Sequence, residues 1–149
     1  MSNVLTTIRY KEVTLRYGES VQQDTLDFAE AIAQHGRRRL YLRLWLDVNG
    51  GTVSQQTVFF TAPRFLDLRR APVQSALHSH SDGVIEIEFS SLVFQHRVAF
   101  DLEGTEYRAS DNFFDLYPNV PHRVLVHAAN LTEAELSERL HTRSLVDSY

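Results

Sequence analysis

A strict alternation of residues between positions 40 and 48 constrains the fold of this chain more than any other feature of its sequence. Every second position is a leucine or a valine, and the positions between them carry polar or aromatic side chains. The apolar row is Leu40, Leu42, Leu44, Leu46 and Val48. Because successive side chains of a strand point to opposite faces, the pattern predicts a β-strand with one core face. Asn49-Gly50-Gly51 follows, and its tolerance of positive φ predicts a tight hairpin into a second strand from about Thr52 to Phe60.

Similar period-two rows recur along the rest of the chain, with turn residues between them. The rows expected to face a core are Ile85, Ile87 and Phe89, and then Leu92, Phe94, His96, Val98 and Phe100. A further strand is expected over Val120–Ala128. Seven or eight short strands separated by turns are typical of an antiparallel sandwich or barrel. No series of helical segments separates the strands, which argues against a parallel sheet.

One short helix is predicted near the C-terminus. Thr132 and Glu135 have the spacing of a capping box, which would begin a helix over Glu133–Leu140. Earlier in the chain, Phe28–His35 is either a single helical turn or an irregular crossover. The predicted fold class is therefore all-β with one short C-terminal helix.

The composition excludes several classes of function. The chain has 149 residues, 43% of them hydrophobic and 23% charged, which fits one globular domain. It has no cysteine, which excludes disulfides, zinc–thiolate sites and a thiol nucleophile, and no cofactor is expected. A formal charge of -4 argues against nucleic acid as a partner, and no apolar run approaches the ~20 residues that span a membrane. No signal peptide is visible at the N-terminus, and the localisation stays open.

The clearest candidate for a metal site is His78-Ser79-His80-Ser81-Asp82. In an extended chain His78, His80 and Asp82 would project to one side, and a small metal enzyme is one hypothesis. Asp82-Gly83 bends the chain where the third ligand is needed, so a hairpin tip is favoured and no metal site is predicted. Glu86 and Glu88 share a face, as in a solvated strand, and are not predicted to be a catalytic pair. Arg37-Arg38-Arg39 is interpreted as a solvated turn in preference to an anion site.

The single tryptophan, Trp45, lies on the strand face opposite the leucines, beside Tyr41 and Arg43. Exposed aromatic side chains on a β-sheet can contact another domain, stack against sugar rings or lie under a loop of their own domain. Contact with another domain is the favoured interpretation, and Tyr41 and Trp45 are the residues predicted to make either a domain contact or a sugar contact.

Two stretches carry a family resemblance. The first is Val58–Leu68, and the second is Ser110, Asp111, Asn112, Phe113, Phe114, Asp115 and Leu116, which we call the signature segment. In this order, with Leu131–Leu136 and Arg143–Tyr149 behind them, they resemble the C-terminal end of bacterial β-mannosidases of glycoside hydrolase family 2. The signature segment is the most specific part, and the resemblance extends from about Leu40 to Tyr149.

The resemblance implies both a fold and a role. In that family an immunoglobulin-like β-sandwich closes a long multidomain enzyme, so residues 1–149 are expected to be a single antiparallel sandwich domain, a C-terminal fragment of a larger glycosidase. The two glutamates of such a retaining enzyme lie on a (β/α) barrel, for which this chain is too short. The implied function is a non-catalytic accessory and scaffolding domain, whose partners are the other domains of a parent β-mannosidase. The alternative is a carbohydrate-binding module with Tyr41 and Trp45 as its stacking platform.

The signature segment itself is predicted to be structural. Ser110, Asp111 and Asn112 are turn and capping residues, whose short side chains bond to nearby backbone groups. The side chains expected to be buried anchors are Phe113, Phe114 and Leu116. Pro118 cannot donate to a sheet ladder and is expected to end the segment.

Overall fold

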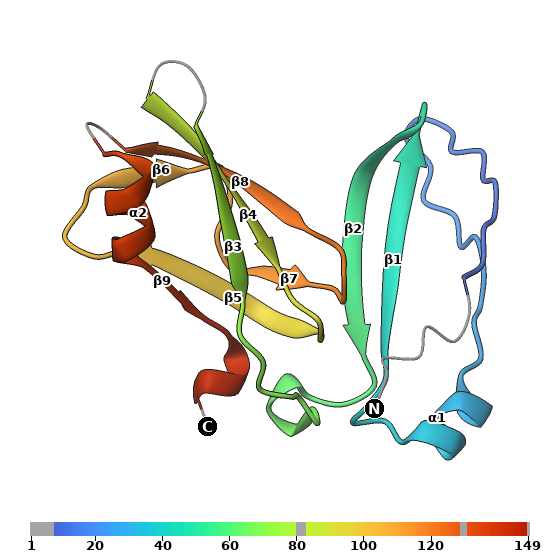
Figure 1. Cartoon of the computed structure of the whole chain (residues 1–149). Coiled ribbons are helices and arrows are strands. Elements are labelled where there is room, and N and C mark those ends of the chain that lie inside the picture. Colours follow the sequence, from blue (N-terminus) through green and yellow to red (C-terminus); the bar gives the residue numbers. More distant parts are fainter. Residues whose placement is uncertain (1–7, 80–82, 129–130, 149) are drawn as a thin grey trace. The chain divides into compact units, whose positions relative to one another are not determined.

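The structure is a computed structural model that describes residues 8–79, 83–128 and 131–148 (Figure 1). Its contacts divide the chain into two compact units, of which one ends at Asp67 and the other begins at Leu68. The sequence led us to expect a single sandwich over residues 1–149, whereas the sandwich in this structure lies after Leu68. No helix of the described residues is long and apolar enough to cross a bilayer.

The N-terminal unit is built around a two-stranded antiparallel sheet. It contains α1 (Ala29–His35), β1 (Tyr41–Val48), β2 (Gly51–Phe59) and the 3-10 turn η1 (Pro63–Phe65). The predicted hairpin is confirmed, since Val48 pairs with Gly51 across the two-residue turn. Asn49 and Gly50 adopt φ of 51° and 81°, and positive φ at both central positions is what a twisted hairpin of this length requires.

This unit buries little of its apolar surface. Leu66 is the only buried residue among residues 8–67, and it keeps 8% of its surface exposed. Within the predicted core row of β1, Leu44 and Val48 are exposed and the other members are half-buried. The core face expected on β1 is therefore not formed within this unit, because two strands and one short helix supply too few side chains to cover it.

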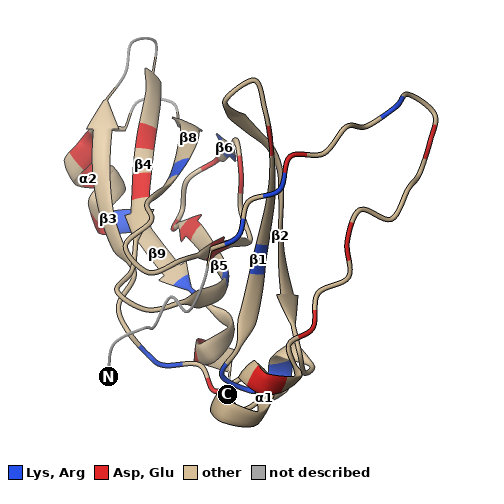
Figure 2. Ribbon diagram, turned by 90° about the vertical axis from the view of Figure 1, so that its right-hand side faces the viewer, with Lys and Arg blue, Asp and Glu red and all other residues tan. Residues whose placement is uncertain are grey.

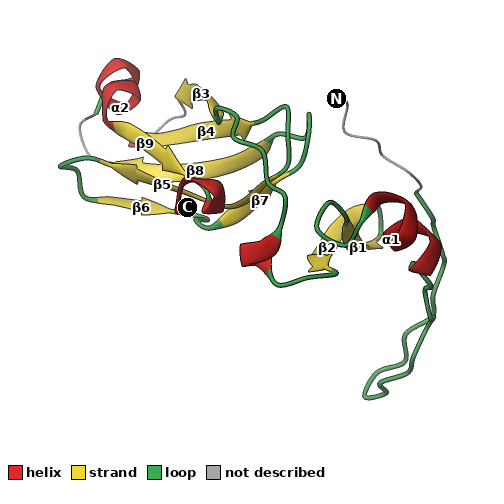
Figure 3. Ribbon diagram, turned by 90° about the horizontal axis from the view of Figure 1, so that it is seen from below, coloured by secondary structure: helices red, strands yellow, loops and turns green. Residues whose placement is uncertain are grey.

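The C-terminal unit is an antiparallel β-sandwich, which confirms the predicted fold class (Figure 3). One sheet has the order β3-β4-β8-β6, and the other has the order β7-β5-β9. The four-stranded sheet consists of β3 (Gln74–Ser79), β4 (Val84–Ser90), β8 (His122–Ala128) and β6 (Tyr107–Ala109). The three-stranded sheet consists of β7 (Phe114–Leu116), β5 (Gln95–Leu102) and β9 (Leu140–Arg143). The chain also forms α2 (Glu133–Arg139) and the 3-10 turn η3 (Leu145–Ser148).

Side chains from both sheets form the core of this unit. The phenyl ring of Phe89 on β4 lies 5.2 Å from that of Phe100 on β5 and 5.3 Å from that of Phe114 on β7, measured between ring centroids. The predicted inward rows are buried as expected, with one exception. Leu92 precedes β5 in a turn and is exposed, because the strand begins only at Gln95.

Helix α2 begins with the predicted capping box. The Thr132 hydroxyl accepts a hydrogen bond from Glu135 N (3.3 Å), and the Glu135 carboxylate accepts one from Thr132 N (3.0 Å). The two bonds satisfy amide groups that the first turn of a helix leaves without partners. Leu136 then points into the core with no exposed surface. The helix ends at Arg139, since Leu140 already belongs to β9.

Candidate functional site

The signature segment begins directly after β6 and includes β7. Its Asn112 side chain bonds to the backbone of β5. The side-chain oxygen of Asn112, Oδ1, accepts hydrogen bonds from Phe100 N (3.1 Å) and from Phe113 N (3.0 Å). The side-chain nitrogen of Asn112, Nδ2, donates to Phe100 O (3.0 Å). The side chain therefore takes the place of a backbone partner for β5 just before β7 begins.

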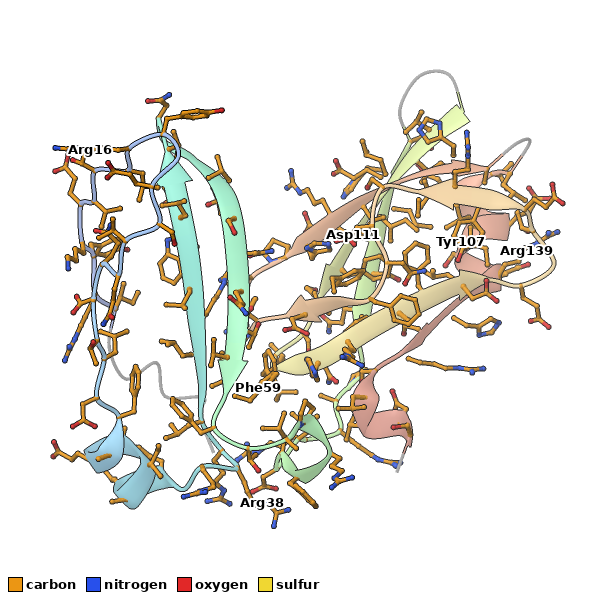
Figure 4. All side chains as sticks on the ribbon, turned by 180° about the vertical axis from the view of Figure 1, so that it is seen from behind. Arg16, Arg38, Phe59, Tyr107, Asp111 and Arg139 are labelled. Atoms are coloured by element: carbon orange, nitrogen blue, oxygen red, sulfur yellow. The ribbon has the colours of Figure 1, made fainter. Side chains whose placement is uncertain are left out.

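The two residues before Asn112 bond the segment to β8. Ser110 N donates to Leu125 O (2.9 Å), and Leu125 N donates to the Ser110 hydroxyl (3.0 Å). One carboxylate oxygen of Asp111 accepts from Asn112 N (2.8 Å), and the other lies 3.0 Å from His122 Nε2. Figure 4 labels Asp111 among the side chains of the sandwich. Ser110 therefore bonds to the backbone of β8, while Asp111 bonds to the adjacent backbone amide and to the His122 side chain on β8.

Asp115 holds an irregularity in β5. The pairing of β5 with β7 shifts register between Gln95 and Val98, and Arg97 in this interval has a φ of 52°. One oxygen of Asp115 accepts from Arg97 N (3.0 Å) and is hydrogen-bonded to His96 Nδ1 (2.7 Å). His96 and Asp115 are both largely covered, with 9% and 17% of their side-chain surfaces exposed. This pair explains why a histidine stands in an apolar row.

The three apolar residues of the signature segment differ in their burial. Phe114 and Leu116 are buried, and the ring of Phe114 stacks on that of His122 at a centroid distance of 4.1 Å. Phe113 is 72% exposed and has a φ of 69°. The expectation that Phe113 is a buried anchor is therefore wrong. Phe114 and Leu116 are alternate residues of β7 and share its buried face, whereas Phe113 lies just before the strand and does not have an extended backbone.

Tyr107 also bonds to the backbone of β5, a contact that the sequence did not predict; Figure 4 labels this residue. Its hydroxyl donates to Phe100 O (3.1 Å), the same carbonyl that accepts from Asn112. Desolvation of the hydroxyl, followed by the nearby Asp101 carboxylate, raises the pKa of Tyr107. No spacing in the sequence relates Tyr107 to Asn112, since the two meet only through the backbone of β5.

The acidic and histidine residues that were weighed as catalytic or metal-binding candidates pair with side chains or strands of the sandwich. Glu86 and Glu88 on β4 lie 3.7 Å and 3.0 Å from the Arg123 guanidinium on β8 (Figure 2). His78 is exposed and pairs across the sheet with Glu86, while His80 and Asp82 lie outside the described residues. Over residues 8–79, 83–128 and 131–148, no group of three or more histidine, cysteine or acidic side chains could hold a metal ion.

In the N-terminal unit, Arg37-Arg38-Arg39 lines a shallow cavity of about 530 Å³ together with Asp67. Arg38 Nε donates to Phe65 O (2.6 Å), and Arg39 Nε bonds to the Asp67 carboxylate (2.8 Å). Two of the three arginines are thus bonded to the segment that follows β2. This bonding, together with the exposure of all three arginines, favours the interpretation of the basic run as a solvated turn over an anion site.

Tyr41 and Trp45 lie on one face of β1, where Trp45 has neighbours within its own unit. The ring of Tyr10 stands edge-on to Trp45 at a centroid distance of 6.4 Å. The Arg43 guanidinium lies 5.7 Å from the centre of the indole. Trp45 keeps 37% of its surface exposed. The indole is therefore partly covered, and the rest of it is exposed to solvent.

The boundaries of the sandwich coincide with those of a known family. The model of the Ig-fold domain named Ig_mannosidase matches residues 68–148, which is more than half of the chain. The chain belongs to this family. No curated protein matches it.

Membership of the Ig_mannosidase family confirms the resemblance on which the sequence interpretation rested. The matched region begins at the residue where the C-terminal unit begins, and it includes the whole signature segment. Val58–Asp67, which contributed to the resemblance, lies before the match. An Ig-fold domain of this kind is a non-catalytic, mannosidase-associated domain, and its fold alone does not assign the activity of a larger protein.

Proposed function

We propose that this chain is the C-terminal accessory part of a β-mannosidase-type glycoside hydrolase, whose retaining chemistry resides in a barrel domain outside this sequence. The match to a mannosidase Ig-fold domain is the observation that carries the proposal, because it spans the sandwich from its first residue almost to its last. The role of the sandwich is to pack against other domains of that enzyme.

The chemistry of the signature segment supports a scaffolding role. Its hydrogen-bonding side chains are used within the sandwich: Asn112 bonds to the backbone of β5, Ser110 to β8 and Asp115 to the bulge at Arg97. A side chain that completes backbone pairing stabilises the fold, and its reactive atoms are occupied. The segment therefore has the properties of an ordered corner of the domain.

Two measurements test this function. The reading frame that contains this chain is expected to encode a (β/α) barrel upstream, and the longer protein is expected to hydrolyse a chromogenic β-mannoside. The 149-residue chain at the same concentration is expected to give no turnover above buffer. Turnover by the isolated chain, or a reading frame without a barrel, would contradict the proposal.

A carbohydrate-binding function is the second candidate, because Trp45 stays partly exposed on the same face as Tyr41. Its indole is the only one in the chain, so its fluorescence reports on this surface alone. A scaffolding role predicts unchanged Trp45 emission when mannooligosaccharides are titrated into the chain. A saturable shift of the emission that is lost in Tyr41→Ala would favour the binding module instead.

A further inference from the structure

Phe113 combines an unfavourable backbone with an exposed aromatic ring. Its φ of 69° lies in the left-handed region, where a Cβ crowds the following carbonyl and where bulky residues are rarely found. Phe113 is 72% exposed, so little burial within the chain compensates for the conformation. Neither local propensity nor packing of this domain explains why a phenylalanine occupies the position.

The neighbours of Phe113 on both sides impose its conformation. Before it, the Asn112 carbonyl oxygen accepts from Phe113 N at 3.0 Å while the same side chain bonds Phe100 on β5. After it, Phe114 is buried and stacks on His122. A strained residue persists only when its surroundings over-determine it, and such residues concentrate where proteins bind or react. The signature segment thus fixes an aromatic side chain on the outside of the sandwich.

A second exposed residue of positive φ lies on the adjacent strand, β5. Arg97 has a φ of 52°, sits in the bulge of β5 and is exposed. It directly precedes Val98, the partner of Phe114 in the pairing of β5 with β7. Phe113 and Arg97 therefore flank the Val98–Phe114 pair, one on each side of it along the ladder, and both are exposed at positions of unfavourable φ.

We propose that Phe113 is a docking anchor that inserts into an apolar pocket on another domain of the parent glycosidase, with carboxylates at the rim of that pocket pairing with Arg97. The inference rests on the function proposed above and assigns the surface that carries it out. A protein partner is favoured over a sugar because one isolated ring offers no extended stacking platform. Aromatic residues and arginine are also enriched at the energetically dominant positions of protein interfaces.

The experiment compares one substitution in two contexts. In the isolated 149-residue chain, Phe113→Gly removes an exposed ring and relieves the left-handed backbone, so it is expected to raise the melting temperature by a few degrees. In the full-length glycosidase the same change removes the anchor and is expected to lower the melting temperature. Asn119→Gly is the matched control, since Asn119 is also a non-glycine residue of positive φ (58°). This substitution is expected to shift the melting temperature in the same direction in the isolated chain and in the full-length protein.

A second variant tests the charged part of the interface. Arg97→Glu is expected to leave the melting temperature of the isolated chain within about a degree of the wild-type value. In the full-length protein the same substitution is expected to lower the melting temperature. If either Phe113→Gly or Arg97→Glu has the same effect in both contexts, the docking proposal is overturned while the accessory function stands. A reading frame that encodes no further glycosidase domain overturns both together.

Discussion

At the scale of single residues, the backbone of Phe100 on β5 bonds to two side chains from other parts of the sandwich, Tyr107 on β6 and Asn112 in the signature segment. Its carbonyl accepts hydrogen bonds from Asn112 and from Tyr107, and its amide donates to Asn112. A carbonyl oxygen has two lone pairs, and both have partners here. The sequence indicated that Asn112 bonds to the backbone, because short polar side chains do so in turns. It could not indicate which backbone, since the partner lies twelve residues earlier on a strand placed by tertiary packing.

The two adjacent phenylalanines of the signature segment form a matched pair for mutation. Phe114→Ala is expected to lower the free energy of unfolding by about 3–5 kcal/mol, because the ring is buried between Phe89 and His122 and its loss leaves a cavity. Phe113→Ala changes an exposed ring one position away and is expected to cost less than about 1 kcal/mol. Urea unfolding followed by far-ultraviolet circular dichroism measures both. Equal losses from the two variants would contradict the burial described here.

At the scale of elements, predictions that depend on local chemistry agree with the structure. The β1–β2 turn and the start of α2 follow from residues within four positions of one another, Asn49-Gly50 in one case and Thr132 with Glu135 in the other. The predicted core face of β1 failed because burial depends on what lies across the strand, which no local pattern specifies. The exposure of Phe113 has a similar origin, since its backbone conformation is imposed by Asn112 and β5.

The capping box of α2 gives the protein a predictable dependence on pH. Hydrogen bonds from the backbone and side chain of Thr132 lower the pKa of Glu135 below its ordinary value of 4.5. A group whose pKa is lower in the folded state stabilises the fold above its unfolded pKa, and that contribution is lost as the pH falls through the lowered value. The difference in urea midpoint between the wild type and Glu135→Gln is therefore expected to be constant at neutral pH and to shrink below about pH 4.5.

A second variant on the same helix distinguishes the pH dependence that comes from the capping box from the pH dependence that any carboxylate on α2 would give. Glu138→Gln removes a carboxylate that lies outside the capping box. Its difference from the wild type is expected to change less between pH 7 and pH 3 than that of Glu135→Gln. A Glu135→Gln difference that stays constant over this range would show that the charged form of Glu135 does not stabilise α2.

At the scale of the whole molecule, the position of the sandwich is the main departure from the sequence prediction. Period-two rows occur both before and after Asp67, so the pattern alone reads as one continuous set of strands. The two halves differ in burial. Buried core residues are numerous after Leu68, whereas Leu66 alone is buried among residues 8–67. Burial depends on how many strands meet around one interior, and alternation along a single strand does not encode that number.

This difference predicts that the two units lose structure at different urea concentrations. Trp45 is the only tryptophan and lies in the N-terminal unit, so its emission follows that unit alone, while circular dichroism is dominated by the strands of the sandwich. A two-stranded sheet without a core is marginally stable, and the sandwich has a core drawn from two sheets. The Trp45 signal is therefore expected to change at lower urea than the circular dichroism transition, which should stay cooperative in a chain of residues 68–149. Coincident transitions for both probes would mean that residues 8–67 share the stability of the sandwich, because two-state unfolding requires such coincidence.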